Sequence, residues 1–228
     1  MFKTETHLHT ADVSRCSRLH AKKLVELYKA AGYSTIFVSD HFQASSMDTL
    51  GDMPWDHKIS VFLSGYYRAR HAAAEYGITV LPCAEFGFSG TKNHFLAYGI
   101  TKEFLCANPD LHKRTPEEFA RIAHEAGIFI VHAHPFRDAN RAPMPQLVDA
   151  IEVYNSNPRH ENNSALAEAL AIEHGLPCTA GSDTHRTEDV ALSGIMTETE
   201  IKTVADYIKL VKAGKVTVIK SEEMQASY

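Results

Sequence analysis

The chain has 228 residues, a formal net charge of −5 at pH 7, and a composition that is 44% hydrophobic and 22% charged. These values are typical of a folded globular domain, and they exclude a disordered, collagen-like or coiled-coil chain. No run of about 18 apolar residues occurs and the first ten residues lack the layout of a signal peptide, so we expect a cytoplasmic protein without a membrane partner. The sequence has no basic run, and therefore no strong nucleic-acid signal.

Short β-rich runs alternate along the chain with longer amphipathic patterns, which is typical of βα units and a mostly parallel sheet. Strands are predicted at residues 2–6, 34–38, 79–83, 95–98, 128–131, 150–153 and 177–179. Helices are predicted near residues 21–31, 59–76, 116–126 and 162–174, and a glycine follows each of them, as expected at a helix end. The length fits one α/β barrel domain over residues 1–228, with 220–228 as a frayed tail.

Residues 43–56 interrupt this alternation, and an irregular stretch of that length is typical of a lid or binding loop. The four cysteines are widely spaced without a CxxC pair, which argues against a disulfide framework or a thiolate zinc site. The unusual feature of the composition is its 14 histidines, because histidine is the commonest metal ligand.

Many of these histidines, together with several acidic residues, stand where a predicted strand ends or just beyond it. They are His7, His9, Asp40, His41, Glu85, His94, His132, His134, Asp183 and His185. The carboxyl ends of the strands in a closed parallel barrel converge on one face, so we expect these side chains to meet there. We expect the remaining histidines to be loop, helix-cap or solvated residues.

The spacing of the first two histidines fits a shared ligand. Residues two apart in a strand point the same way, so His7 and His9 can bind one ion while Leu8 faces the opposite side. The same spacing recurs in "HAHP" and "SDTH", and this repetition favours a metal site over scattered core and surface histidines. By the same alternation Asp40 points away from the ligands, which predicts an orienting or structural role.

Seven motifs, "HLHT", "VSDH", "CAEF", "HFLAYG", "HAHPFR", "IEVYN" and "AGSDTH", follow one another over roughly residues 1–190. In kind and order they resemble the PHP domain family, named for polymerase and histidinol phosphatase. The resemblance implies a distorted (β/α)7 barrel, similar to a TIM barrel, that holds two or three divalent ions and hydrolyses phosphoesters. Seven strands are also what the sequence pattern predicts.

The resemblance also implies a set of metal ligands. His7, His9, Glu85 and Asp183 would hold a first ion, Glu85 would bridge to a second ion completed by His94 and His134, and His41 and His185 would hold a third. Relatives often have one more ligand in the loop after the first motif, usually histidine. Here that loop reads "ADVSRC", where Asp12 or Cys16 could substitute, and we favour Asp12. His132 is the alternative to His134, which we prefer because the family motif reads HP.

A mixed set of imidazoles and carboxylates suits Zn, Mn or Fe ions rather than Mg²⁺ or Ca²⁺. A metal-bound hydroxide would attack phosphorus, with Glu85, Asp183 and His134 as the implied catalytic residues. Arg137 and Arg15 are candidate phosphate clamps, because a guanidinium fork matches phosphate oxygens, although either could be an ordinary surface arginine. We therefore predict a histidinol-phosphatase-like, metal-dependent phosphoesterase.

Two alternatives stay open. An amidohydrolase would use a similar barrel to cleave a C–N bond, and the motif "HAHPFR" argues against it. An inactive regulatory or nucleic-acid-associated module would keep only the fold, and the complete first ligand set argues against that. Histidinol phosphate, a nucleotide and an oligonucleotide end are all compatible substrates. A domain of this size has little surface to grip a duplex, which favours a small phosphorylated molecule.

Overall fold

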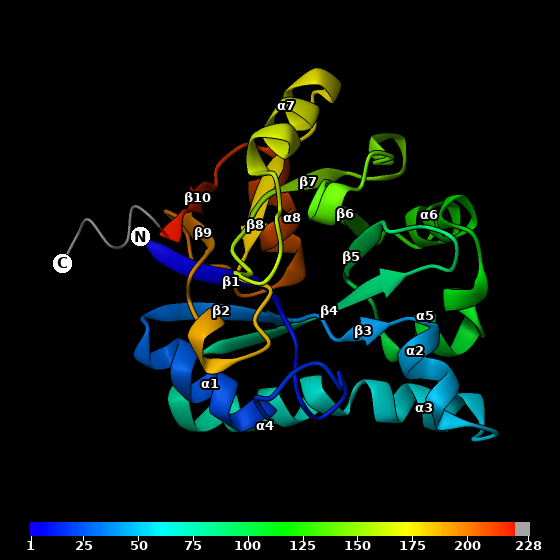
Figure 1. The fold of residues 1–228 in the computed structure, drawn as a ribbon. Helices are drawn as coiled ribbons and strands as arrows, with labels where there is room; N and C mark the ends of the chain where they lie inside the picture. The colour runs from blue at the N-terminus through cyan, green and yellow to red at the C-terminus, as the bar shows by residue number, and fades with distance from the viewer. Residues whose placement is uncertain (222–228) are drawn as a thin grey trace.

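A computed structural model describes residues 1–221 and shows a nearly closed barrel of strands with helices packed around it (Figure 1). The strands of the described chain are β1 (Phe2–Leu8), β2 (Tyr33–Val38), β3 (His41–Phe42), β4 (Thr79–Gly87), β5 (His94–Tyr98), β6 (Phe129–Ala133), β7 (Ala150–Asn155), β8 (Cys178–Gly181), β9 (Gly194–Thr197) and β10 (Thr217–Ile219). The helices are α1 (Ala21–Ala30), α2 (Ala44–Met47), α3 (Trp55–Phe62), α4 (Ser64–Tyr76), α5 (Lys102–Ala107), α6 (Pro116–Glu125), α7 (Ser164–His174) and α8 (Val204–Lys212).

All seven predicted strands are present, as β1, β2, β4, β5, β6, β7 and β8, and the predicted α/β barrel is confirmed. The strand order is β10-β9-β1-β2-β4-β5-β6-β7-β8, with β3 paired to β4. Most neighbouring strands are parallel, but β5 is antiparallel to both β4 and β6, and β9 is antiparallel to both β1 and β10. His94 begins β5 opposite Gly87 at the end of β4, so the reversed strand still brings its first residue to the face where the other strands end.

The barrel is joined between β1 and β8 by a short contact. The first half of β1 pairs with β9, while its end forms a parallel bridge between Leu8 and Thr184. Glu5 stabilises this contact between β1 and the end of β8, because its Oε1 accepts hydrogen bonds from the backbone N–H groups of His7 and Ser182, each at 2.9 Å. A Cβ on Gly181 would lie 2.5 Å from the Cβ of His7, so only glycine allows this approach.

Apolar side chains fill the barrel interior and the layer beneath the helices. Tyr207 of α8 is fully buried and packs against Phe37 and Tyr98, with ring centroids 4.9 and 4.5 Å apart. Helix α8 therefore closes one end of the barrel and leaves the other end for the histidines. Helices α1 and α4 lie along one side of the sheet and α7 on another (Figure 1). Within residues 1–221, no helix has the length and hydrophobicity needed to cross a bilayer.

Helix α6 confirms the start predicted from its sequence, because Thr115 and Glu118 form a reciprocal capping box before Pro116. The helix predicted over 59–76 is divided at Leu63 into α3 and α4, where a following serine and glycine weaken the helix. The prediction of an irregular loop over residues 43–56 was wrong in part. This stretch contains α2, a 3₁₀ turn at Asp48–Leu50 and the start of α3. In the predicted tail, residues 222–228 lie outside the described residues.

Candidate metal centre

Glu85 lies at the centre of the strand-end cluster and is 1% exposed. Its Oε1 is 2.9 Å from both His94 Nδ1 and His134 Nε2, and its Oε2 is 2.8 Å from His41 Nδ1. His7 and His9 approach the same carboxylate, with Nε2 atoms 3.6 and 3.4 Å from its oxygens. Five imidazoles from four segments of the chain thus surround one buried carboxylate, which is a geometry suited to bridging two ions.

Asp183 faces the first two histidines from the loop after β8. Its Oδ1 is 3.5 Å from His7 Nε2 and 3.2 Å from His9 Nε2. Ligand atoms of His7, His134 and Asp183 lie within 4.8 Å of one another, as do those of His7, His9 and Glu85. Asp183 has φ 51° and His134 φ 31°, and such left-handed backbone in residues other than glycine is typical of functional sites.

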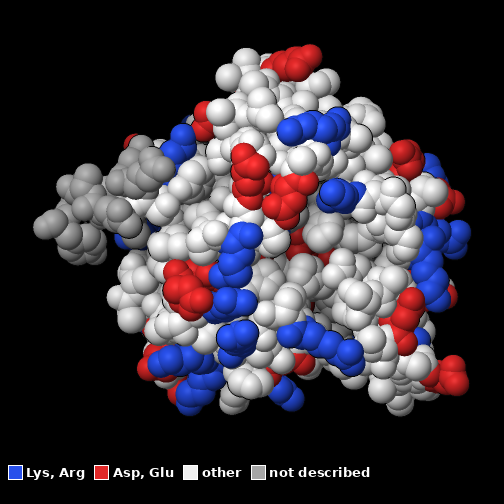
Figure 2. Space-filling view, viewed as in Figure 1, with Lys and Arg blue, Asp and Glu red and all other residues white. Residues whose placement is uncertain are grey.

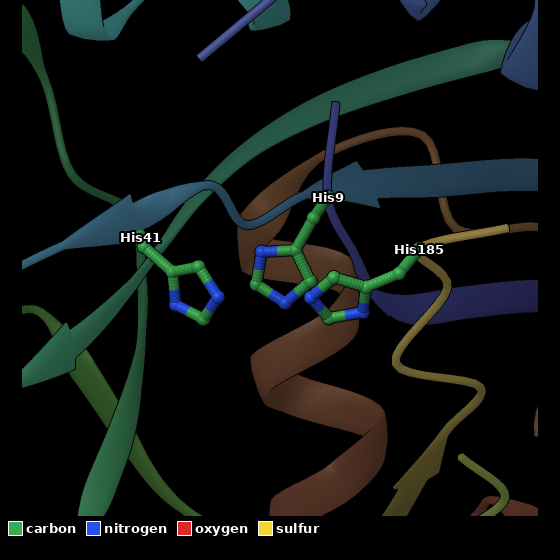
Figure 3. Close-up of side chains that lie close together, drawn as sticks. All are labelled: His9, His41 and His185. Atoms are coloured by element: carbon green, nitrogen blue, oxygen red, sulfur yellow. The ribbon is translucent and has the colours of Figure 1, made fainter. Parts of the chain in front are cut away.

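A second cluster, of imidazoles alone, is formed by His9, His41 and His185. Figure 3 shows their rings side by side, from the segments after β1, at β3 and after β8. The ring centroid of His9 is 4.2 Å from that of His41 and 4.4 Å from that of His185. His9 therefore lies between both parts of the site, whereas the sequence motifs assigned it to the first ion alone.

Cys16 faces this second cluster and lines the same cavity as His41 and His185. Burial alone would raise the pKa of its thiol, but contact with the two imidazoles outweighs burial and lowers the pKa to about 6. Thiolates are strong ligands for zinc and similar ions. Of the two candidates in the loop "ADVSRC", Cys16 is therefore the one that the structure brings to the histidines.

Asp12, the favoured candidate, is engaged elsewhere. Its Oδ2 accepts a hydrogen bond at 2.7 Å from the backbone N–H of Ala21, the first residue of α1. Its Oδ1 lies 2.5 Å from Arg68 Nη1 and 3.2 Å from His20 Nδ1. Asp12 thus caps helix α1 and does not face the cluster, so the preference for it over Cys16 is corrected.

His132 and His134 do not share a face, although they are two residues apart. Strand β6 ends at Ala133, and the positive φ of His134 turns its side chain into the cluster. His132 remains buried beside Phe95, where burial lowers the pKa of its imidazole to about 4. The preference for His134 over His132 agrees with this geometry, but the alternation argument does not hold for this pair.

Glu152 on β7 is a site residue that the sequence analysis missed. Its Oε1 accepts a hydrogen bond at 2.9 Å from Nδ1 of His7, and its Oε2 accepts from the backbone N–H of His134 at 3.0 Å. This contact fixes the tautomer of His7 and directs its Nε2 toward Glu85 and Asp183. The signal in the sequence was a charged residue inside the otherwise apolar run "AIEVYN".

The two arginine candidates occupy different places. Arg137 Nη2 lies 2.5 Å from Asp183 Oδ2 and 2.9 Å from Asn155 Oδ1, and its Nε donates to Asn162 at 2.9 Å. Arg137 lines the cavity above the cluster, whereas Arg15 is exposed and does not line it.

Asp40 accepts hydrogen bonds from Thr10 and Ser14 of the first loop, in agreement with its expected structural role.

The chemistry of the cluster fits bound cations. Burial raises the pKa of the Glu85 carboxyl, but the imidazoles of His94, His41 and His7 lower it more, so it stays well below its usual range. Arg137 and His7 do the same for the pKa of Asp183. Among the described residues, His9 Nδ1, His41 Nδ1 and Glu85 Oε2 are buried without a hydrogen bond, because the 2.8 Å contact between the last two atoms lacks hydrogen-bond geometry. Such orphaned ligand atoms are costly unless an ion satisfies them.

A cavity of about 610 Å³ opens above the cluster. Figure 2 shows a hollow near the middle of this face, with basic side chains around it and acidic atoms visible inside. Its walls include Lys92, Arg137, Arg159 and Arg186. This volume is in the usual range for small-molecule sites.

Known proteins share the barrel and part of the sequence pattern. Residues 160–216 match a family model described as PHP-associated, and no curated protein matches the chain significantly. A two-domain protein from Bacteroides vulgatus, described as containing a predicted PHP-like metal-dependent phosphoesterase, superimposes with a TM-score of 0.71 at 15% identity. The alignment covers 96% of this chain and 64% of that one, so this chain spans less than two thirds of the two-domain protein.

Two further solved structures carry other activities in their descriptions. A lesion-specific endonuclease from Pyrococcus furiosus has a TM-score of 0.61 at 15% identity, over 95% of this chain and 57% of that one. An amidohydrolase from Chromobacterium violaceum has a TM-score of 0.57 at 16% identity, over 97% and 99%.

The fold and the cluster define a PHP-like barrel with a histidine- and carboxylate-rich centre at its mouth. The matching family model, described as PHP-associated, covers residues 160–216, and the shared fold agrees with the resemblance that the sequence motifs indicated.

Proposed function

We propose that this protein is a metal-dependent phosphoesterase that hydrolyses a small phosphorylated molecule. The observation that carries the proposal is the arrangement of imidazoles around the buried Glu85 carboxylate, with Asp183 and Arg137 beside it. Divalent ions bound there would activate water for attack on phosphorus and neutralise charge on the phosphate. Zn, Mn or Fe ions suit this donor set.

We assign the ligands in three groups, in line with the family resemblance. The first ion would take His7, His9, Glu85 and Asp183, the second Glu85, His94 and His134, and the third His41, His185 and Cys16. In the third group Cys16 replaces Asp12, because Asp12 caps helix α1. His9 stands between the first and third groups and is within reach of both.

Several residues of the chain would position the substrate and the ligands. Glu152 holds His7 with its Nε2 toward the centre. Asp183, Asn155 and Asn162 fix the Arg137 guanidinium through Nη2 and Nε, and no acceptor among the described residues bonds to its Nη1. That free N–H edge would donate to a phosphate oxygen at the floor of the cavity.

The phosphoesterase is favoured over the two alternative activities by the same residues. The amide bond that an amidohydrolase cleaves is uncharged, so it would leave the free N–H edge of Arg137 without an anionic partner at the metal centre. A nuclease acting on a long duplex needs more contact surface than one cavity of about 610 Å³ provides. A small phosphomonoester matches both the positive charge of the cavity walls and the volume of the cavity.

A substrate panel on the protein loaded in turn with zinc, manganese or iron tests the proposal. The panel contains a phosphomonoester, a phosphodiester and an N-acyl amino acid, with Glu85→Gln as the negative control. We expect hydrolysis of the phosphomonoester above the rate of the control. Hydrolysis of the N-acyl compound alone would indicate an amidohydrolase, and no turnover with any metal would indicate an inactive module.

A further inference from the structure

One cation at the mouth of the cavity is not used by the proposed phosphate site. Lys92 is exposed, lines the cavity, and has no hydrogen bond or ion pair with any residue in 1–221. The other basic residues of the walls have carboxylate partners. Arg137 binds Asp183, Arg159 binds both oxygens of Asp189 at 2.7 and 2.6 Å, and Arg186 lies 3.8 Å from Glu188.

The backbone that carries Lys92 is held in place by its neighbour Asn93, which is 1% exposed. Asn93 Nδ2 donates to the carbonyl oxygen of Ala142 at 2.8 Å, and Asn93 Oδ1 accepts from Asn140 Nδ2 at 2.6 Å. These bonds tie the loop between β4 and β5 to the loop after β6, which also carries Arg137. The backbone of Lys92 is therefore held beside the cavity, while its side chain has no hydrogen bond or ion pair with a described residue.

The position of Lys92 relative to the metal centre sets what it can reach. It precedes the ligand His94 by two residues, and two residues of extended chain span about 7 Å. Arg186 follows the ligand His185 in the loop after β8, and two strands, β6 and β7, separate β5 from β8 along the sheet. Lys92 and Arg186 thus belong to different walls, and Lys92 is on the wall that also carries Arg137.

We propose that Lys92 binds a second anionic group of the substrate, a carboxylate or another phosphate, while the ester phosphate lies at the metal centre. This inference rests on the proposed phosphoesterase function and narrows its substrate class. An unpaired ammonium at a site that already receives a phosphate attracts negative charge and repels positive charge. A phosphate ester of an amino alcohol, such as histidinol phosphate, would bring an ammonium toward this lysine and is disfavoured.

Binding of two phosphonates tests the inference without turnover. Phenylphosphonate carries one anionic group and 4-carboxyphenylphosphonate carries two, and calorimetry on the metal-loaded protein gives their affinities. We expect the carboxylated compound to bind about five- to twentyfold more tightly, as for one added charge-assisted hydrogen bond. Lys92→Gln should abolish this preference, Lys92→Arg should keep it, and Lys22→Gln on exposed helix α1 should leave both affinities unchanged.

Turnover separates this inference from the function on which it rests. The substrates are phenyl phosphate, 4-carboxyphenyl phosphate and 4-(aminomethyl)phenyl phosphate. For each substrate, kcat/KM of Lys92→Gln is divided by kcat/KM of wild type, because this ratio removes differences in intrinsic reactivity between the substrates. We expect kcat/KM to fall for the carboxylate and rise for the ammonium compound, mainly through KM. Absence of hydrolysis of all three would overturn the phosphoesterase proposal, while the calorimetry still decides the anion site. Equal binding of both phosphonates by wild type, or an equal effect of Lys92→Gln on both, would overturn the inference.

Discussion

Replacing Asp12 with alanine should destabilise the protein and leave its metal content unchanged. The carboxylate accepts the backbone N–H of Ala21 at 2.7 Å, and losing such a helix cap costs about 1 kcal/mol. The ion pair with Arg68 adds about 0.5 kcal/mol at most, because the Arg68 side chain is 65% exposed. A loss of about 1.5 kcal/mol lowers the Tm of a chain of this size by about 3 to 6 °C.

The effect of this substitution should depend on pH. Burial raises the pKa of Asp12, but the N–H of Ala21 and the Arg68 guanidinium lower it more, so the folded-state value lies below the ordinary value of 3.8. A carboxyl group whose pKa is lowered by folding stabilises the protein at pH values above its unfolded-state pKa. That stabilisation is lost as the pH falls through its folded-state pKa. The difference in Tm between wild type and variant should therefore be full at pH 7 and shrink below about pH 4.

Thermal unfolding followed by circular dichroism, together with elemental analysis of the same samples, checks this prediction. Asp12→Asn is the matched control, because asparagine also caps helices and should lose less stability. If Asp12→Ala instead lost about one ion per chain and kept its Tm, the carboxylate would be a ligand and the assignment of Cys16 would fail.

Three other substitutions test the ligand assignments. Glu85→Gln should lose at least one ion per chain by elemental analysis and nearly all activity, because the bridging charge is gone, whereas His124→Ala, on the outside of α6, should match wild type. Glu152→Gln should weaken metal affinity about 10- to 100-fold in chelator competition, because His7 loses the partner that orients it. Cys16→Ser should remove the thiolate charge-transfer absorption of the cobalt-loaded protein, and an unchanged spectrum would mean that the thiol is not a ligand.

The main features of the barrel could be predicted from local patterns. Most of the seven predicted strands are short runs rich in apolar residues and bounded by polar or turn residues, and the structure moves their ends by up to four residues. Strands β3, β9 and β10 were not predicted, because two to four residues with no clear alternation give no local signal. The reversal of β5 follows from the tight connection after β4 and could not be seen in its composition.

The grouping of the candidate ligands could largely be predicted because these residues stand at strand ends, and strand ends in a barrel converge. What the sequence could not give is the path of the loop after β1. That loop turns Asp12 toward α1 and Cys16 toward the histidines, and this depends on the contacts of Asp12 with Ala21 and Arg68. Glu152 was missed because it lies within a buried strand, where a single charged residue does not show which partner it has.

The most direct test of the central claim is the metal content of the purified protein. After reconstitution and removal of loosely bound ions, elemental analysis should find at least two transition-metal ions per chain, and Glu85→Gln should hold fewer. Fewer than about one ion per chain in the wild type would contradict the account, because the buried imidazoles and carboxylates around Glu85 would then have no ion to bind.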